Sequence, residues 1–140
     1  MTFIFDEGIG PQIVECLRDM EFQNVKHISE IVPRGTPDIG FLPGIGQRGD
    51  VLVTKDRKMV QMRGKNGHLA VLLKFKVKII LLPPSFGNAR SAQQLIWIRT
   101  YWSTIMTSWE SVPDRTLCKV SASGVIEPIS LPRLDPETTL

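Results

Sequence analysis

Short apolar runs that do not alternate with polar residues restrict this chain to a narrow set of folds. Three such runs, at residues 2–5, 50–54 and 77–82, have the sequences TFIF, DVLVT and VKIILL. A strand with one face in water alternates apolar and polar side chains, whereas a continuous apolar strand is typical of a parallel sheet covered on both faces. The runs therefore predict a buried, mainly parallel sheet.

Helical patterns fill the segments between these runs. Apolar residues recur every three or four positions in residues 11–21 and 65–75, which predicts two amphipathic helices. A longer helix is predicted at residues 89–109. Its apolar stripe consists of Leu95, Ile98, Trp102, Ile105 and Trp109. The alternation of strands and helices predicts an α/β fold with helices on both faces of a central sheet.

Two segments in the first half of the chain are less regular. Residues 24–28, NVKHI, predict one further strand. The sequence PRGTPD then interrupts the pattern before residues 38–47, which contain three glycines and Pro43. Glycine and proline weaken any helix there, so the local sequence leaves the form of this segment open.

The end of the chain predicts a β-hairpin at residues 116–129. With 140 residues, 42% of them hydrophobic, the chain is long enough for one core. We therefore expect a single domain at residues 1–129 and a flexible C-terminal tail at residues 130–140. Trp97 and Tyr101 lie off the apolar stripe of the long helix. They either pack under the hairpin or form an exposed aromatic pair for a partner chain.

Composition excludes several classes of protein. The net charge of +3 is a mild bias toward polyanions, far from that of a basic tail. No apolar run reaches the roughly 18 to 20 residues of a membrane span. The two cysteines, Cys16 and Cys118, are far apart and lack zinc-ligand spacing. A reduced, cytoplasmic protein without membrane contact is the expectation.

Acidic residues follow two of the predicted strands at the point where each strand ends. Asp6 and Glu7 come directly after the first predicted strand. Asp56 follows the strand at residues 50–54, and Asp38 begins the segment that leads to that strand. Binding sites in open parallel α/β sheets form beyond the carboxyl ends of the strands. We therefore expect these acids to gather at one edge of the sheet.

Carboxylates that share one edge repel each other, and a hard divalent cation such as Mg²⁺ relieves that repulsion. Such an ion can orient water and stabilise charge on a phosphoryl group during hydrolysis. Basic residues near the acids could hold the phosphate. They are Arg34, Lys55, Arg57 and Lys58. A phosphodiester is therefore the substrate that this combination predicts.

Each of these residues also has a structural interpretation. Asp38 suits the first turn of a helix behind a Thr-Pro cap. Asp56 suits a turn, and Asp6 suits an N-cap or an Asx turn. The basic run is by itself typical of a solvated face, and neither His27 nor His68 has a paired nucleophile in the sequence. The functional interpretation rests on the shared edge.

Three stretches, in their order along the chain, resemble the PIN-like domain family, in the branch of VapC-type toxins of toxin–antitoxin systems. They are FIFDEGIGPQIVECLRDM at residues 3–20, PRGTPD at 33–38 and GDVLVTKDRK at 49–58. The long helix and the final SASGVIEPI hairpin are also similar. The resemblance implies a three-layer α/β/α sandwich with a mainly parallel sheet and a short C-terminal hairpin.

The resemblance also implies a function, a metal-dependent ribonuclease that prefers single strands. Asp6, Asp38 and Asp56 would hold Mg²⁺ or Mn²⁺, and water would attack the phosphodiester. Thr54, in the T-x-D arrangement, resembles the hydroxyl residue that supports the last acid. Toxins of this type are homodimers bound by a small antitoxin, so the expected partners are RNA, an antitoxin and a second copy of the chain.

The sequence departs from this branch in its acids. The branch carries further acids directly after the position of Asp38 and in the helix after TKD. Here the residues after Asp38 are Ile39, Gly40 and Phe41. The equivalent helix offers Asn66 and His68 instead. This smaller set of carboxylates would weaken the binding of a second metal ion, or Glu7 or Glu30 would have to substitute for the missing acids.

Two other functions fit parts of the pattern. A PIN-like module with a depleted metal site would bind RNA or a protein without cutting. A phosphoacceptor receiver domain would also place an acidic pair after its first strand and an acid after its third, here Asp6, Glu7 and Asp56. Receivers place a lysine after their last parallel strand, and no such lysine is evident, so this function ranks last.

Overall fold

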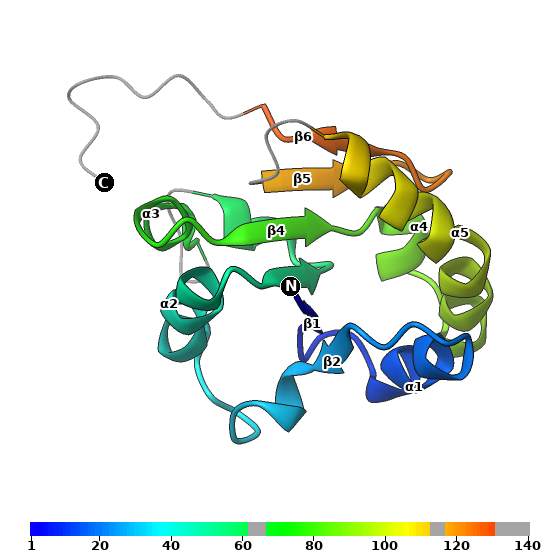
Figure 1. Cartoon of the computed structure of the whole chain (residues 1–140), viewed down its shortest axis with the longest axis horizontal. Helices are drawn as coiled ribbons and strands as arrows, with labels where there is room; N and C mark the ends of the chain where they lie inside the picture. The colour runs from blue at the N-terminus through cyan, green and yellow to red at the C-terminus, as the bar shows by residue number, and fades with distance from the viewer. Residues whose placement is uncertain (62–66, 113–116, 131–140) are drawn as a thin grey trace.

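The computed structural model describes residues 1–61, 67–112 and 117–130, which form one six-stranded sheet with helices on both faces (Figure 1). The strands are β1 (Phe3–Phe5), β2 (Val25–His27), β3 (Val51–Thr54), β4 (Lys78–Leu81), β5 (Leu117–Val120) and β6 (Ile126–Pro128). The α-helices are α1 (Pro11–Asp19), α2 (Asp38–Arg48), α3 (Leu69–Lys74), α4 (Pro84–Gly87) and α5 (Ser91–Ser111). Two 3₁₀ helices are η1 (Ile28–Glu30) and η2 (Arg57–Val60).

The sheet has the strand order β2-β1-β3-β4-β5-β6. All neighbouring pairs from β2 to β5 are parallel, and only β6 runs antiparallel, to β5. The predicted α/β fold with a mainly parallel sheet and a C-terminal hairpin is therefore confirmed. The chain passes from β1 to β2 on one side and returns to β3 on the other. The carboxyl ends of β1 and β3 therefore flank the position where the strand order reverses, and ligands bind at such positions in α/β sheets.

Both faces of the sheet are apolar, which explains the continuous hydrophobic runs. Phe3 and Phe5 of β1 pack on the side of α1 and α5, whereas Ile4 between them packs on the side of α2 and α3. The same alternation repeats in β3, where Leu52 faces the second side. In Figure 1 the two pairs of helices lie on opposite sides of the sheet. Side chains that alternate in direction are therefore all buried.

Helix α2 occupies the segment whose form the local sequence leaves open. It includes Pro43 and is capped by Gly49, which has a left-handed backbone with φ of 71°. Tertiary packing explains why this segment is helical and why position 46 is a glycine. A Cβ atom at Gly46 would lie 2.2 Å from the carbonyl oxygen of Phe75, so only glycine allows α2 to approach the end of α3 this closely.

The remaining predictions on elements have mixed outcomes. Of the predicted helix at residues 65–75, the first two residues lie outside the described part of the chain, and α3 begins at Leu69, after the backbone N–H of His68 donates to Met59 O. Trp97 and Tyr101 pack under the hairpin, where Trp97 Nε1 donates to Ala122 O over 3.3 Å. The predicted tail lies outside the described residues from position 131 onward. Among the helices of the described ranges, none has the length and apolar character needed to cross a membrane.

Candidate active site

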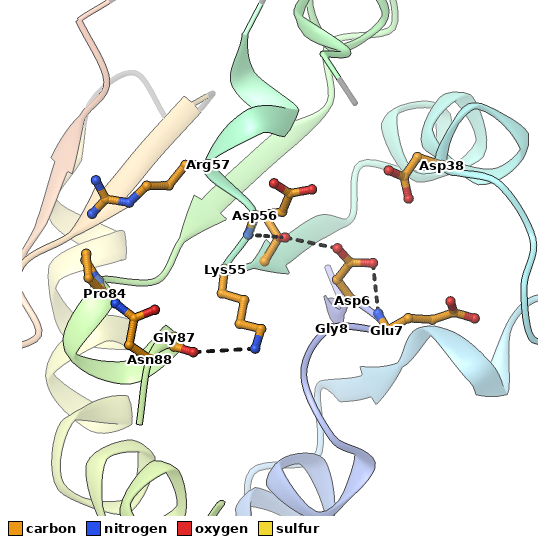
Figure 2. A pocket seen from close by; sticks show the side chains of 11 residues that line it. Asp6, Glu7, Gly8, Asp38, Lys55, Asp56, Arg57, Pro84, Gly87 and Asn88 are labelled. Atoms are coloured by element: carbon orange, nitrogen blue, oxygen red, sulfur yellow. Dashed lines mark hydrogen bonds between the residues drawn. The ribbon is translucent and has the colours of Figure 1, made fainter. Parts of the chain in front are cut away.

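A pocket of about 790 Å³ opens at the carboxyl ends of β1 and β3 (Figure 2). Its lining residues come from these strand ends, from the start of α2 and from the segment after β4. They are Asp6, Glu7, Gly8, Asp38, Thr54, Lys55, Asp56, Arg57, Pro84, Gly87 and Asn88. The three aspartates predicted from the sequence therefore line one pocket, together with Glu7, Thr54, Lys55 and Arg57.

Asp6 forms the floor of this pocket. It follows β1, and its backbone N–H donates to Val53 O, so the register of β1 and β3 sets its position. The residue is only 9% exposed. Oδ1 accepts the backbone N–H of Glu7 at 2.8 Å, and Oδ2 accepts the hydroxyl of Thr54 at 3.0 Å. A buried carboxylate is thus held by two donors in one orientation.

The pKa of Asp6 is raised above its ordinary value. Burial is the largest cause, because desolvation disfavours the charged carboxylate. The hydrogen bonds from Thr54 and Glu7 lower the pKa in part, and the negative charges of Asp38 and Asp56 raise it further. The three aspartates therefore interact electrostatically, and any added cation between them would favour the ionised form of Asp6.

Thr54 links the first acid to the last. Its hydroxyl donates to Asp6 and accepts the backbone N–H of Asp56 at 3.1 Å. Thr54 is fully buried at the end of β3. Asp56 caps η2, since its Oδ1 accepts the backbone N–H of Lys58 at 3.0 Å. One buried hydroxyl therefore couples the side chain of Asp6 to the backbone that carries Asp56.

Asp38 is the first residue of α2 and contributes to the pocket lining from that helix. Its Oδ2 lies 3.2 Å from Nε2 of His68, the residue that caps α3. His68 therefore contacts one of the acids, a role that was not predicted for it. The sequence does contain a signal for this role, because His68 lies in the segment where the resembling branch carries a further acid.

Lys55 and Arg57 supply positive charge to the same pocket. The stem of Lys55 runs between two glycines. A Cβ at Gly8 would lie 3.4 Å from its Cε, and a Cβ at Gly87 would lie 3.5 Å from its Cβ. Its Nζ donates to Gly87 O over 3.5 Å (Figure 2). Within the described ranges Lys55 forms no ion pair, which leaves its ammonium available to an anion.

Other predicted residues lie apart from this arrangement. Arg34 and Lys58 are not among the residues that line the pocket. Glu7 lines it, but its Oε1 accepts the backbone N–H of Gly35 at 2.8 Å, and Figure 2 shows its carboxylate directed away from Asp6. Glu30 is part of a separate network with Arg18. Neither glutamate is positioned beside the carboxylate of Asp6.

The donor set fits a hard divalent cation in its chemistry. Mg²⁺ prefers oxygen ligands, keeps several waters and is commonly held by one or two carboxylates plus substrate phosphates. Asp6, Asp38 and Asp56 provide carboxylates of this kind around one pocket. Across the part of the chain that is described, no group of three or more His, Cys, Asp or Glu residues could hold a metal ion as it stands. Waters and a substrate phosphate would have to complete the coordination.

The pocket wall formed by Pro84, Gly87 and Asn88 was not predicted from the sequence. This wall follows β4, so the strand-end rule that selected Asp6 and Asp56 also applies to it. Buried Gln94 holds the wall in place, because its Nε2 donates to Phe86 O at 3.1 Å. The segment contains no charged residue, so a pattern of acids and bases carries no signal for it.

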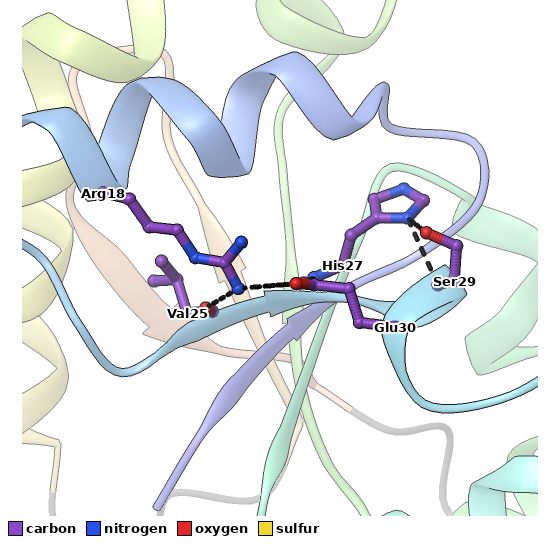
Figure 3. Close-up of polar contacts among 5 residues, drawn as sticks. All are labelled: Arg18, Val25, His27, Ser29 and Glu30. Carbon is purple, nitrogen blue, oxygen red and sulfur yellow. Dashed lines mark hydrogen bonds and ion pairs between the residues drawn. The ribbon is translucent and has the colours of Figure 1, made fainter.

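Glu30 closes a capping box at η1 (Figure 3). Its Oε2 accepts the backbone N–H of His27 at 2.7 Å, and its carboxylate binds Arg18 at 2.9 Å. Burial acts to raise the pKa of Glu30, but these two partners outweigh it and the pKa is lowered. A lowered pKa stabilises the fold above the ordinary titration range of the residue and loses that effect as the pH falls through the lowered pKa.

We therefore expect Glu30→Gln to lower the free energy of unfolding at pH 7 by about 0.5 kcal/mol, the size of an exposed ion pair. Urea unfolding at pH 7 and in strongly acidic solution measures this difference, which should disappear in acid. Glu15→Gln, an exposed glutamate on α1, is the matched control. A difference that persists unchanged in acid would contradict the assignment to the Glu30 charge.

Comparison with known proteins gives one match. The family model described as PIN like domain matches residues 1–83, which is more than half of the 140 residues. The matched range includes Asp6, Asp38, Thr54 and Asp56. Neither the search of curated proteins nor the search of solved structures finds a match.

Proposed function

This chain belongs to the PIN-like domain family, a nuclease superfamily, and on that premise we propose that it is a metal-dependent endoribonuclease that hydrolyses RNA phosphodiester bonds. The observation that carries the proposal is that Asp6, Asp38 and Asp56 line one pocket together with Lys55 and Arg57. Carboxylates can hold a metal ion and basic side chains can hold a phosphate, so their presence around one concave site suits phosphodiester hydrolysis.

We assign the metal ligands to Asp6, Asp38 and Asp56. When bound there, Mg²⁺ or Mn²⁺ would supply charge stabilisation at the phosphoryl group and a more acidic water. Asp6 is the best-positioned ligand, because two hydrogen bonds fix its orientation. The charges of Asp38 and Asp56 contribute to its raised pKa, and a cation bound among the three carboxylates would relieve that repulsion. Thr54 keeps Asp6 and the backbone of Asp56 in register.

The basic residues of the pocket would hold the RNA backbone. Lys55 extends across the pocket toward Gly87 and faces the acids without pairing with one. An anionic phosphate placed between Lys55 and the metal would therefore contact positive charge on both sides. Arg57 is exposed at the rim and suits a neighbouring phosphate. Lys58 is exposed outside the pocket and would act through its charge alone.

The biological role that we propose is that of the toxin of a toxin–antitoxin pair, acting in the cytoplasm. The support is the resemblance of FIFDEGIGPQ, PRGTPD and VTKDRK to the VapC-type branch. That role implies a small antitoxin protein as partner and a homodimer as the active form. Co-purification of the chain with the product of a neighbouring gene is the direct measurement.

A second candidate function is a PIN-like module that binds RNA without cutting it. Two observations favour it. The described residues contain no group of three ligands that could hold a metal by itself, and Asp38 is already in contact with His68. The receiver-domain alternative has less support. The first five strands of this chain have the order β2-β1-β3-β4-β5, which flavodoxin-like folds such as receivers share, so topology does not separate a receiver from a PIN-like domain. The family match favours the PIN-like assignment.

Metal-dependent cleavage separates the two candidates. We expect the protein to cleave a mixed-sequence single-stranded RNA in Mg²⁺ or Mn²⁺, and to stop when EDTA removes the ion. Asp56→Asn should lower the rate at least about tenfold, because it removes one negative charge from the metal site. Asparagine is also a good N-cap, so this change keeps the start of η2 intact.

The control for this assay is Asp19→Asn, which removes an exposed aspartate at the end of α1, away from the pocket. It should leave the cleavage rate unchanged. RNA binding without cleavage in any divalent ion would reject the ribonuclease and support the binding module. Cleavage that persists in EDTA would reject the metal site.

A further inference from the structure

A second, smaller pocket of about 300 Å³ lies beside the candidate active site. We call it the Arg34 pocket; its lining residues are Glu7, Pro11, His27, Ser29 and Arg34. Glu7 lines both pockets, so they adjoin at this residue. We propose that the Arg34 pocket binds the nucleotide next to the scissile phosphate of an RNA strand, with Arg34 on its phosphate. The inference rests on the proposed function and extends it by one subsite.

The back wall of the Arg34 pocket is rigid. His27 is only 5% exposed, and its Nε2 lies 2.7 Å from Ile9 O. Its Nδ1 accepts the backbone N–H of Ser29 at 3.2 Å and lies 2.7 Å from Ser29 Oγ (Figure 3). These partners assign the ring proton to Nε2, which donates to Ile9 O. The imidazole therefore has no free nitrogen and serves as a fixed wall.

Ser29 gives the wall a hydrogen-bonding character. Its hydroxyl proton is directed to His27 Nδ1, because that nitrogen is an acceptor. The lone pairs of Ser29 Oγ remain available, and the residue is exposed. A ribose 2′-hydroxyl is a donor that such an oxygen can accept, and it is the group that distinguishes RNA from DNA. The wall therefore suits a ribonucleotide.

Arg34 is presented by a formed turn. The backbone N–H of Thr36 donates to Pro33 O at 3.1 Å, and Gly35 has a positive φ of 83°. The N–H of Gly35 donates to Glu7 Oε1, which attaches the turn to the residue between the two pockets. The position of Arg34 relative to the active site is thus set by a direct hydrogen bond.

The charge of Arg34 has no partner in this arrangement. Within residues 1–61, 67–112 and 117–130, no carboxylate forms an ion pair with it. A guanidinium binds phosphate oxygens in a bidentate manner. An RNA strand carries one phosphate per nucleotide, and the Arg34 pocket adjoins the active-site pocket at Glu7. The proposal therefore places consecutive phosphates of one strand in the two pockets.

Arg34→Gln tests the subsite, with Arg99→Gln as the matched control. Arg99 is an exposed arginine of α5 that lines a groove on another part of the molecule. Binding to fluorescent single-stranded RNA is measured by stopped flow in Mg²⁺, before hydrolysis proceeds, because the acids repel a phosphate when no cation is bound. For a trinucleotide with two internal phosphates, Arg34→Gln should weaken binding about tenfold, the size of one charge-assisted hydrogen bond. A dinucleotide with one internal phosphate should bind both variants and the wild type equally.

Salt dependence gives a second readout. The slope of log K against log salt for the trinucleotide should become shallower by about 0.7 in Arg34→Gln, the contribution of one phosphate contact on a single strand. It should keep its wild-type value in Arg99→Gln. Equal Tm values of the variants exclude loss of folding as the cause of weaker binding.

The possible results separate the subsite from the proposed function. If RNA is cleaved but Arg34→Gln binds and cleaves as Arg99→Gln does, the subsite is rejected and the ribonuclease stands. If Arg34→Gln weakens trinucleotide binding and its salt dependence as expected, but no metal ion supports cleavage, the subsite stands and the ribonuclease proposal fails. If inorganic phosphate competes equally with the dinucleotide and the trinucleotide, and the third nucleotide adds no affinity, Arg34 is a free-anion site and the proposal is overturned.

Discussion

Asp6→Asn is expected to slow RNA cleavage strongly while making the metal-free protein more stable. The catalytic loss should be roughly 10²- to 10³-fold, the size found when one preorganised electrostatic group is removed from an active site. Asparagine keeps the shape of the side chain and an oxygen for the N–H of Glu7. It removes the buried negative charge that Asp38 and Asp56 repel. Activity and stability should therefore change in opposite directions.

The pH dependence gives this prediction its sign. The pKa of Asp6 is raised in the folded state, so the folded protein binds the proton more tightly than the unfolded chain. Stability of the wild type then falls as the pH rises from the ordinary aspartate range through the raised pKa, and stays reduced above it. Asp6→Asn lacks this loss. Urea unfolding without divalent ions should show equal stabilities in acid and a more stable variant at pH 7.

A stability control completes this experiment. Asp19→Asn changes an exposed aspartate and should leave both activity and stability near their wild-type values. Loss of activity alone does not separate a catalytic role of Asp6 from a structural one, so the Tm of each variant is measured beside its cleavage rate. A variant that loses activity and stability together would make Asp6 a structural residue. A variant that keeps full activity would remove Asp6 from the metal site.

Gly46→Ala is expected to destabilise the fold by about 3 kcal/mol, at the upper end of the usual cost of overpacking. The added Cβ would lie 2.2 Å from Phe75 O and 3.1 Å from the Cγ2 atom of Val77. The first of these atoms belongs to the backbone, so a side-chain rotation cannot relieve the clash. Helix α2 would have to move, and Asp38 at its first position would move with it.

Gly44→Ala is the matched control in the same helix. A Cβ at Gly44 would meet only the end of the flexible Arg48 side chain, at 3.1 Å. Alanine is a better helix former than glycine, so this variant should be neutral or more stable by up to about 1 kcal/mol. Guanidinium unfolding of both variants measures the difference. Equal effects of the two substitutions would show that the approach of α2 to Phe75 does not limit the packing.

The strands and the longer helices were predictable because their signals are local. Continuous apolar runs predicted a sheet covered on both faces, and the structure buries Phe3 and Phe5 on one side and Ile4 on the other. The spacing of Ile98, Trp102, Ile105 and Trp109 predicted the buried stripe of α5. Each of these patterns repeats within a few residues, so it needs no knowledge of distant contacts.

The candidate site was predictable only in part. Asp6 and Asp56 follow from the rule that parallel strands end at one edge, and the pocket at that edge contains both. The same rule applies to Asn88 after β4, but the prediction considered only charged residues at the strand ends. The place of Arg34 was not predictable, because a hydrogen bond between Gly35 and Glu7 sets it, and these residues are 28 positions apart.

The sequence alone therefore determines the sheet, the main helices and the acids at the strand ends, because hydrophobic period and strand polarity act over short distances. Tertiary structure alone decides that residues 38–48 form a helix despite Pro43, because Gly46 packs on Phe75. It also decides that Asp38 meets His68 and that Lys55 crosses between Gly8 and Gly87. Such contacts join segments distant in sequence, and only close packing of the folded chain selects them.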